Sequence, residues 1–137
     1  MKSNEEIRKT FKIFIDESGL INLDCFKMEK EAEDNARMME LIKDDFFKIF
    51  DENPGKKFRI LADMTTIGGI NRYGFSLQTR KIGAQLIGHQ QIEKGALVTP
   101  SIFVKTVIDF IIALVRKKDS VKIFLDKEEA LKWLTEN

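Results

Sequence analysis

The sequence predicts an α/β fold, in which one domain holds a single five-stranded, mostly parallel sheet with its helices mainly on one face. Two observations support this prediction. Strand-like and helical runs follow one another in the order ββαβαβαβα, and such alternation implies right-handed crossovers between parallel strands. The predicted strands alternate between apolar and polar residues, whereas strands covered by helices on both faces are apolar throughout.

The first predicted elements form a β-hairpin. Residues 10–16 and 20–26 are short β-type runs, and Glu17, Ser18 and Gly19 between them have the composition of a tight turn. Residues 1–9 precede this hairpin without a predicted element, and we expect them to be flexible.

The middle of the chain predicts a long helix and the third strand. Residues 29–50 repeat apolar side chains at the spacing of a stripe that faces a core. These side chains are Ala32, Ala36, Met39, Ile42, Phe46 and Ile49. Residues 53–55, Asn-Pro-Gly, have the turn chemistry that ends a helix. Residues 58–63 are the third predicted strand, and residues 64–75 form a loop that contains glycine.

A second long helix and the fourth strand follow this loop. Ser76 is placed to cap the helix, whose amphipathic run contains Ile82, Leu86 and Ile92. Residues 96–99 are predicted to form the fourth strand.

The last third of the chain contains an unusually apolar helical run. Pro100 and Ser101 begin it, and residues 102–115 continue it over 14 positions. This length is short of the roughly 20 residues that cross a bilayer. Lys105 and Asp109 are also spaced to pair on one helical face. We therefore expect a buried core helix and no stable membrane insertion.

A fifth strand and a final helix close the predicted fold. Residues 121–125 alternate as a strand, and Asp126 can cap the next helix while Glu129 supplies the second half of a capping box. One large apolar residue of this helix is expected to face the core, namely Leu131, Trp133 or Leu134.

The two faces of the predicted sheet differ in polarity. One face is apolar throughout and holds Phe11, Ile13, Ile15, Ile21, Leu23, Cys25, Phe58, Ile60, Ala62, Val98, Val121, Ile123 and Leu125. The opposite face is mixed and holds Lys12, Phe14, Asp16, Asn22, Asp24, Arg59, Leu61, Thr99, Lys122 and Phe124. We infer that most helices pack on the apolar face and leave the mixed face partly exposed to water.

Large apolar residues on the mixed face are Phe14, Phe26, Leu61, Leu97 and Phe124. If they are contiguous, they form a patch suited to a homodimer or another protein partner, with Phe14, Leu61 and Phe124 as candidate interface residues. The alternative is that the N-terminal residues or a loop cover them. The sequence leaves both explanations open.

The composition limits partners and compartment. A formal net charge of +1 gives no electrostatic argument for binding nucleic acid or an acidic membrane. One cysteine, Cys25, excludes an intramolecular disulfide and a thiolate-rich zinc site. The N-terminal residues are charged and lack the apolar region of a signal peptide, so we expect a cytoplasmic protein.

The loop before Ser76 has the glycine and serine spacing of a phosphate-binding P-loop, beginning at Gly69. Phe75 stands where that motif has its lysine, so the charge that meets the terminal phosphates is missing. Two interpretations remain. The free amides of the helix N-terminus, with Arg72 and Arg80, hold an anion, or Ser76 is only a helix cap and the glycines are only turn residues.

No catalytic or metal-binding constellation stands out. His89 is the only histidine, which leaves no His-rich metal site and no Ser–His relay, and we expect it to be solvated or to cap a helix. Cys25 is expected to be a small core residue. Asp63 ends the third strand, and we expect it to accept hydrogen bonds from the following loop. These observations predict a non-enzymatic protein without cofactor or metal.

The order of elements, the LADMTTI step, the Ser76 helix and the C-terminal VKIFLDKEEALKWL together resemble the STAS superfamily. The likeness is greatest to small SpoIIAA-like single-domain bacterial proteins, and it covers residues 10–134. It implies a βα superhelix with strands in nearly sequential order. Relatives include anti-anti-sigma factors and cytoplasmic domains of anion transporters, and CRAL-TRIO lipid-binding domains share the fold.

The resemblance implies a role for Ser76. Anti-anti-sigma factors are switched by phosphorylation of a serine in the motif D-S-S-G, at the start of the helix after the third strand. The matching residues here are Gly74, Phe75, Ser76 and Leu77. Ser76 is the candidate phosphoacceptor, with Thr79 a poorer substitute. A similar run at residues 16–20 lies in the first hairpin, and we interpret it as a turn.

Two hypotheses of function follow. The first is a non-enzymatic, STAS-like regulatory or protein-interaction domain, switched at the loop before the second crossover helix. A phosphate there adds about two negative charges at a helix N-terminus. The contact surface of that loop is Ser76 with Arg72, Gly74, Thr79 and Arg80.

The second hypothesis is the binding of a small hydrophobic, lipid-like ligand or of an anion. Eleven phenylalanines, the apolar run at residues 102–115 and the kinship with CRAL-TRIO domains favour the hydrophobic ligand. The alternative explanation of these apolar residues is a well-packed core.

Overall fold

The computed structural model describes residues 2–27, 29, 31–65 and 76–136. Five strands form one sheet in sequential order, with β1 antiparallel to β2 and the other neighbours parallel. The strands are β1 (Phe11–Ile15), β2 (Ile21–Cys25), β3 (Phe58–Asp63), β4 (Ile92–Val98) and β5 (Val121–Phe124). The predicted five-stranded, mostly parallel sheet with an N-terminal hairpin is confirmed.

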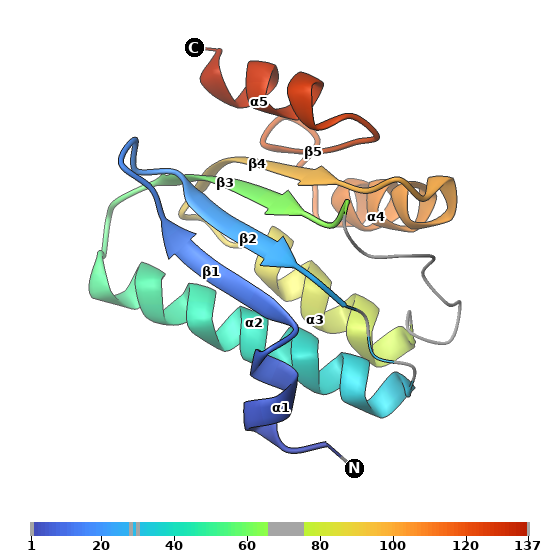
Figure 1. Cartoon of the computed structure of the whole chain (residues 1–137). Coiled ribbons are helices and arrows are strands. Elements are labelled where there is room, and N and C mark those ends of the chain that lie inside the picture. The colour runs from blue at the N-terminus through green and yellow to red at the C-terminus, as the bar shows by residue number, and fades with distance from the viewer. Residues whose placement is uncertain (1, 28, 30, 66–75, 137) are drawn as a thin grey trace.

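The helices of the described residues lie mainly on one face of this sheet, as predicted. They are α1 (Asn4–Arg8), α2 (Ala32–Glu52), α3 (Leu77–Ile87), α4 (Ile102–Leu114) and α5 (Lys127–Thr135). Figure 1 shows α2 and α3 beneath one face and α5 above the other. Apolar residues of α4 share one core cluster with α2 and with the apolar side of the strands, so α4 belongs to the lower layer.

The hairpin turn at residues 16–20 forms as the sequence indicates. The Asp16 amide donates to the Leu20 carbonyl at 3.0 Å, and the Asp16 carboxylate accepts from the Ser18 amide at 2.9 Å. Gly19 adopts φ +89°, a backbone conformation that side chains other than glycine's rarely tolerate.

The start of β4 differs from the prediction. α3 ends at Ile87 with Gly88 as its C-cap, and Ile92, which was assigned to the helix, is the first residue of the strand. The predicted fourth strand at residues 96–99 therefore misses the first half of β4. Short apolar runs fit helix and strand periodicities equally well, and the extra apolar position extended the helix wrongly.

The register of β4 also corrects the predicted faces. Ala62 of β3 pairs with Leu97, and Asp63 pairs with Val98. Because paired residues share a face, Leu97 lies on the apolar side and Val98 on the mixed side, the reverse of the prediction. The cause is local: Ala96, Leu97 and Val98 are all apolar, so this stretch holds no polar residue that fixes which side is which.

The last helix covers the part of the mixed face that β3, β4 and β5 form. Leu61, Ala96 and Val98 are each at most 3% exposed and pack against Ala130 and Leu134 of α5. Leu134 is thus the core-facing residue among the three predicted candidates, and Leu131 is exposed. The sequence left two explanations open for Leu61, an exposed interface patch or cover by the N-terminal residues or a loop. Neither holds, because α5 covers this residue.

The cations of the mixed face hold the C-terminal end of α5. Arg59 donates to the carbonyls of Leu134 and Glu136, and Lys94 donates to those of Trp133 and Glu136, at 3.0 and 2.8 Å. The last carbonyls of a helix lack partners within it and carry partial negative charge. The positive charges on this face therefore dock α5.

The other end of α5 is tied to β3. Asp126 caps the helix by accepting from the Glu128 amide at 3.2 Å, so the predicted capping box with Glu129 is not the contact that forms. Lys127 lies 2.9 Å from the Asp63 carboxylate. Asp63 also accepts from the amide and hydroxyl of Thr65, which confirms its predicted role toward the following loop.

The apolar helix α4 is a core helix on one side only. Val104, Ile108, Ile111 and Ile112 are buried, but Ile102, Phe103, Phe110 and Leu114 are exposed. The expectation of a fully buried helix is wrong for this outer side. None of the described helices is long and apolar enough to cross a membrane.

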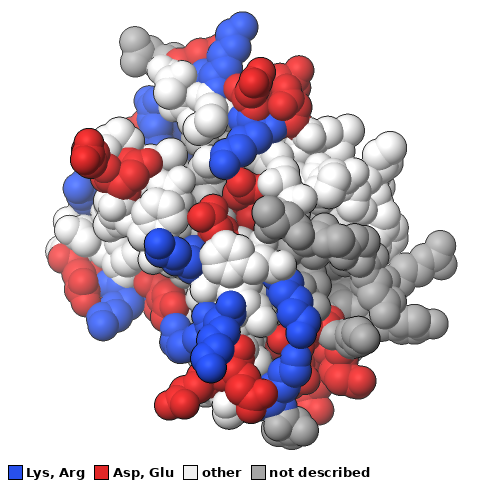
Figure 2. Space-filling view, viewed as in Figure 1, with Lys and Arg blue, Asp and Glu red and all other residues white. Residues whose placement is uncertain are grey.

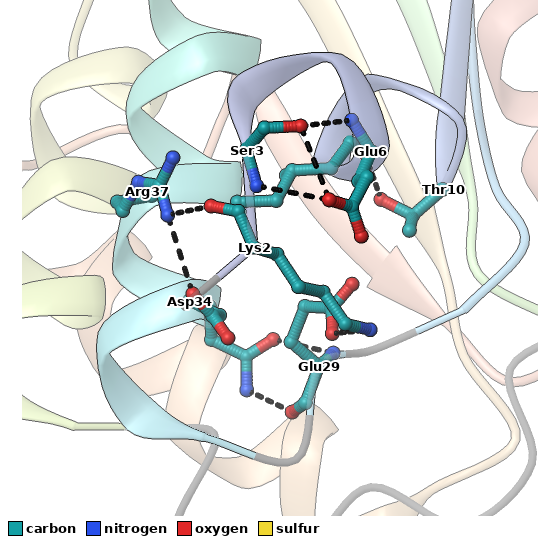
Figure 3. A network of polar contacts seen from close by, with 9 residues as sticks. Lys2, Ser3, Glu6, Thr10, Glu29, Asp34 and Arg37 are labelled. Carbon is teal, nitrogen blue, oxygen red and sulfur yellow. Dashed lines mark hydrogen bonds and ion pairs between the residues drawn. The ribbon is translucent and has the colours of Figure 1, made fainter.

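The N-terminal residues form a short helix that the sequence analysis left unassigned. Ser3 and Glu6 make a reciprocal capping box around α1. Lys2 reaches Glu29 at 2.6 Å, and Arg37 of α2 bonds to the Lys2 carbonyl (Figure 3). These polar contacts surround Ile7, which is fully buried against the core.

Replacing Ile7 with alanine should therefore lower the free energy of unfolding by about 2 to 4 kcal/mol, because a fully buried side chain leaves a cavity. Chemical denaturation followed by circular dichroism measures this change. The exposed neighbour Glu5→Ala should stay within about 0.5 kcal/mol of the wild type. Equal stability of the Ile7 variant and the wild type would show that α1 is dispensable.

The anchoring of α5 should depend on pH. Burial opposes ionisation of Asp63, but hydrogen bonds from Thr65 and the Lys127 ammonium outweigh burial and hold its pKa below the ordinary value. Because the pKa of Asp63 is lower in the folded state, its ionised carboxylate stabilises the folded protein at pH values above the unfolded pKa of about 3.9. This stabilisation is lost as the pH falls through the folded pKa.

The gap in unfolding free energy between wild type and Asp63→Asn should therefore be constant near neutral pH and shrink below about pH 4. Denaturant titrations at several pH values measure this gap. Lys127→Met should weaken the same dependence, because it removes one of the partners that favour the ionised carboxylate. A gap that stays constant down to pH 2 contradicts the assignment.

Candidate functional site

An apolar cavity of about 130 Å³ lies between the sheet and the helices of the lower layer. Its lining is almost entirely carbon. The strands contribute Leu23, Cys25, Ile60, Ala62, Leu97 and Val121, and the helices contribute Met38, Met39, Ile42, Phe46, Leu86, Ile108 and Ile111.

Small residues leave this space open. Gly83 of α3 and Gly95 of β4 line the cavity together with Ala62. A methyl group added at Gly83 would meet only the Met39 side chain, at an ordinary contact distance of 3.8 Å. Met38 and Met39 form part of the wall, and their unbranched, flexible side chains adapt to different contents.

Three polar residues, Asn35, Thr79 and Arg80, are among those that line the cavity, and the side chains of Asn35 and Thr79 are bonded within the protein. The Asn35 side chain is 2% exposed and bonds both the amide and the carbonyl of Glu29. The Thr79 hydroxyl lies 3.1 Å from that of Ser76. Neither group is left to bind a polar part of a ligand, so the interior suits an apolar molecule.

Two residues with reactive side chains are held in structural positions. Cys25 lines the cavity, as the predicted small core residue, and burial raises the pKa of its thiol to about 12, so the thiol stays neutral near pH 7. His89 stacks on the Phe50 ring at 4.3 Å, and burial lowers its pKa. His89 is thus packed among aromatic rings instead of solvated, because α2 brings Phe47 and Phe50 against it.

Ser76 occupies the N-cap position of α3, as predicted. Its hydroxyl oxygen accepts from the Thr79 amide at 3.2 Å, which satisfies one of the free donors of the first turn. Thr79 is buried and Arg80 is exposed, and both residues line the cavity. Arg72 and Gly74, the other predicted members of this loop site, lie outside the described residues.

The predicted interface residues do not form one exposed patch. Leu61 is buried beneath α5, and Phe124 packs 5.8 Å from the Trp133 ring. Phe14 is half-buried on β1, the strand at the far edge of the sheet from β5, with the Lys12 ammonium over its ring. Phe14 and Phe124 therefore lie at opposite edges of the sheet.

Sequence reasoning missed the cavity, and two glycines were the signal that could have found it. Gly83 interrupts an amphipathic helix and Gly95 interrupts a strand, where glycine costs stability and often marks a place that another group approaches. Nothing in the sequence showed that both glycines line the same space. The position of β4 in the sheet and the packing of α3 in the same core place both at the cavity.

The fold and the cavity define a class of protein: a sequentially ordered α/β domain with three helices and an apolar cavity on one face of its sheet. Residues 25–135 match a family model described as SpoIIAA-like. The chain belongs to the SpoIIAA-like family, which confirms the resemblance drawn from its sequence.

Two solved structures are similar to the chain. One is an uncharacterized protein with a SpoIIAA-like fold from Shewanella loihica PV-4, at 17% identity, with 90% of this chain and 91% of that chain covered and a TM-score of 0.54. The other is a protein of unknown function from Arthrobacter sp. FB24, at 16% identity, with 92% and 100% covered and a TM-score of 0.30. The first supports the fold alone. No curated protein matches the chain.

Replacing Ser76 with alanine should lower the unfolding free energy by about 1 kcal/mol, because the Thr79 amide loses its acceptor. Thermal or chemical denaturation measures this loss. Ser76→Asp should stay near the wild type, since aspartate caps helices as well as serine does. If alanine is as stable as serine, the hydroxyl does not act as the cap.

Proposed function

We propose that this protein is a non-enzymatic binding domain that takes a small apolar molecule, or the end of a longer apolar chain, into the cavity beneath its sheet. The observation that carries the proposal is the cavity itself, with its carbon lining and its internally satisfied polar residues. Apolar cavities of about 150 Å³ stay dry and accept molecules the size of benzene. The volume here is comparable.

A ligand in the cavity would offset the free energy that an empty cavity costs the fold. At about 24 cal/mol for each Å³, an empty cavity of this size costs roughly 3 kcal/mol. Domains of this length are stable by only about 5 to 15 kcal/mol, so the cost is a sizeable share. A ligand that fills the space recovers part of it through dispersion contacts with the lining.

The proposal of binding without catalysis is supported by what the reactive side chains do. The Cys25 thiol is neutral, His89 is stacked, and Asp63 is engaged by Thr65 and Lys127. Within the described part of the chain, no group of three His, Cys, Asp or Glu residues could hold a metal ion.

The regulatory hypothesis at Ser76 stays a prediction. Its location at the start of α3, one turn from the cavity residue Thr79, is compatible with a switch that acts on ligand binding. A phosphate at this helix N-terminus would be favoured by the helix dipole. Intact-mass measurement of protein from its native host tests the idea, and a chain that is never modified at Ser76 removes it.

Benzene is a suitable probe of the cavity. Titration should shift the methyl NMR signals of lining residues such as Ile60, Leu97 and Ile108 in a saturable manner. At about 100 times the dissociation constant, the unfolding free energy should rise by about 2.7 kcal/mol. Unchanged methyl signals up to the solubility limit of benzene would overturn the proposal.

The matched variants are Gly83→Leu and Lys81→Leu. The first places a leucine in the cavity, so it should raise the melting temperature and abolish benzene binding. The second places the same side chain on the same helix at an exposed position and should leave benzene binding intact. Equal binding by both variants would show that benzene enters elsewhere.

A further inference from the structure

The outer side of α4 is an exposed apolar surface, which we call the α4 stripe. It consists of Ile102, Phe103, Thr106, Phe110, Ala113 and Leu114, all exposed. The exposed fraction of its large members is 71% for Ile102, 41% for Phe103, and 65% for both Phe110 and Leu114. In Figure 2, uncharged side chains gather on the right, where Figure 1 places α4, whereas charges of both signs are spread over the rest of that view.

No side chain of the α4 stripe presents an unbonded hydrogen-bond donor. Thr106 is its one polar member, and its hydroxyl donates to the Ile102 carbonyl at 2.9 Å. A surface helix normally turns its charged and polar residues to solvent and its apolar stripe to the core. Exposed apolar patches of this kind mark interaction sites on folded proteins.

We propose that the α4 stripe is a homodimer interface, in which α4 of one copy packs antiparallel against α4 of a second copy around a two-fold axis. Such an interface must complement itself, because both copies present the same surface. Along the stripe, Ile102, Thr106, Phe110 and Ala113 alternate large and small at helical spacing. The antiparallel arrangement sets Phe110 of each copy over Thr106 of the other, so the largest side chain near the centre of the stripe meets a small one.

The charges beside the α4 stripe favour the same arrangement. Lys105 and Asp109 lie along one flank and pair within the helix at 2.8 Å. A two-fold axis perpendicular to the helices keeps this flank of both copies on one side and reverses its direction. Lys105 of each copy then lies beside Asp109 of the other. Opposite charges at such flanking positions set partner and orientation in helix pairs.

The exposed area suits an association of moderate strength. Taking about 200 Å² for a fully exposed large apolar side chain, the four large residues expose on the order of 500 Å². A standard interface buries about 800 Å² on each partner, with an apolar centre and a polar rim. The α4 stripe supplies the centre, and the Lys105–Asp109 flank supplies part of the rim.

Sedimentation velocity over a range of concentrations tests the proposal. The full chain should pass from monomer to dimer with rising concentration, and Phe110→Asp should weaken dimerisation by about 30-fold or more, as truncation of a central interface residue does. Circular dichroism must show that the variant is folded. A wild type that stays monomeric at millimolar concentration overturns the proposal, as does a dimer that Phe110→Asp leaves unchanged.

A charge swap tests the antiparallel orientation. Lys105→Asp and Asp109→Lys should each weaken self-association, because each places like charges across the two-fold axis. Mixing the two variants should restore a dimer that contains one copy of each, since opposite charges then meet on both sides. The helix-internal pair is broken in both variants and stays broken on mixing, so a purely structural role cannot produce recovery. Vesicle binding by a strictly monomeric chain would also count against the dimer.

Discussion

The structure depends on the strict alternation of side chains across a sequentially ordered sheet. Three crossover helices pack on one side and hold the continuous apolar core. Among the described helices, α5 alone packs on the other side. It does so through a small apolar contact centred on Leu61, Val98 and Leu134 and through polar anchors at both helix ends. Arg59 and Lys94 bind the terminal carbonyls, and Asp63 binds Lys127. The polar residues on the mixed face of the strands are therefore explained by α5, which they hold through charged contacts.

The same alternation explains where the cavity lies. On the apolar side, each strand contributes every second residue. The small ones, Ala62 of β3 and Gly95 of β4, lie diagonally across neighbouring strands, because Gly95 pairs with Ile60 and Ala62 pairs with Leu97. Gly83 of α3 faces the same space. A methyl group fits at Gly83 without a close contact. Glycine in a helix interior costs stability relative to alanine, and its presence here is consistent with a space used for binding.

Much of this fold could be predicted from sequence because a polar residue between two apolar ones shows which side of a strand faces the core. β1, β2 and β5 contain such residues, and their faces were correct. Ala96, Leu97 and Val98 are all apolar, and there the prediction failed. The apolar run of α4 failed for a different reason: composition cannot tell a helix in the middle of a layer from one at its edge. The cavity forms only where residues of several strands and helices come together, and no local sequence pattern predicts such a meeting.

α4 contributes to two features that cost the fold stability or solubility, namely the apolar cavity and the exposed apolar stripe. Its inner residues Ile108 and Ile111 line the cavity, and its outer residues Phe103 and Phe110 face solvent. A helix that only had to close the core would carry charged residues on its outer side, as α2 does with residues such as Glu33 and Asp44. Polar substitutions there would be nearly neutral for the fold. The apolar residues on the outer side of α4 are therefore not explained by folding alone. The proposed homodimer would cover them, and the proposed ligand would contact the inner residues of the same helix.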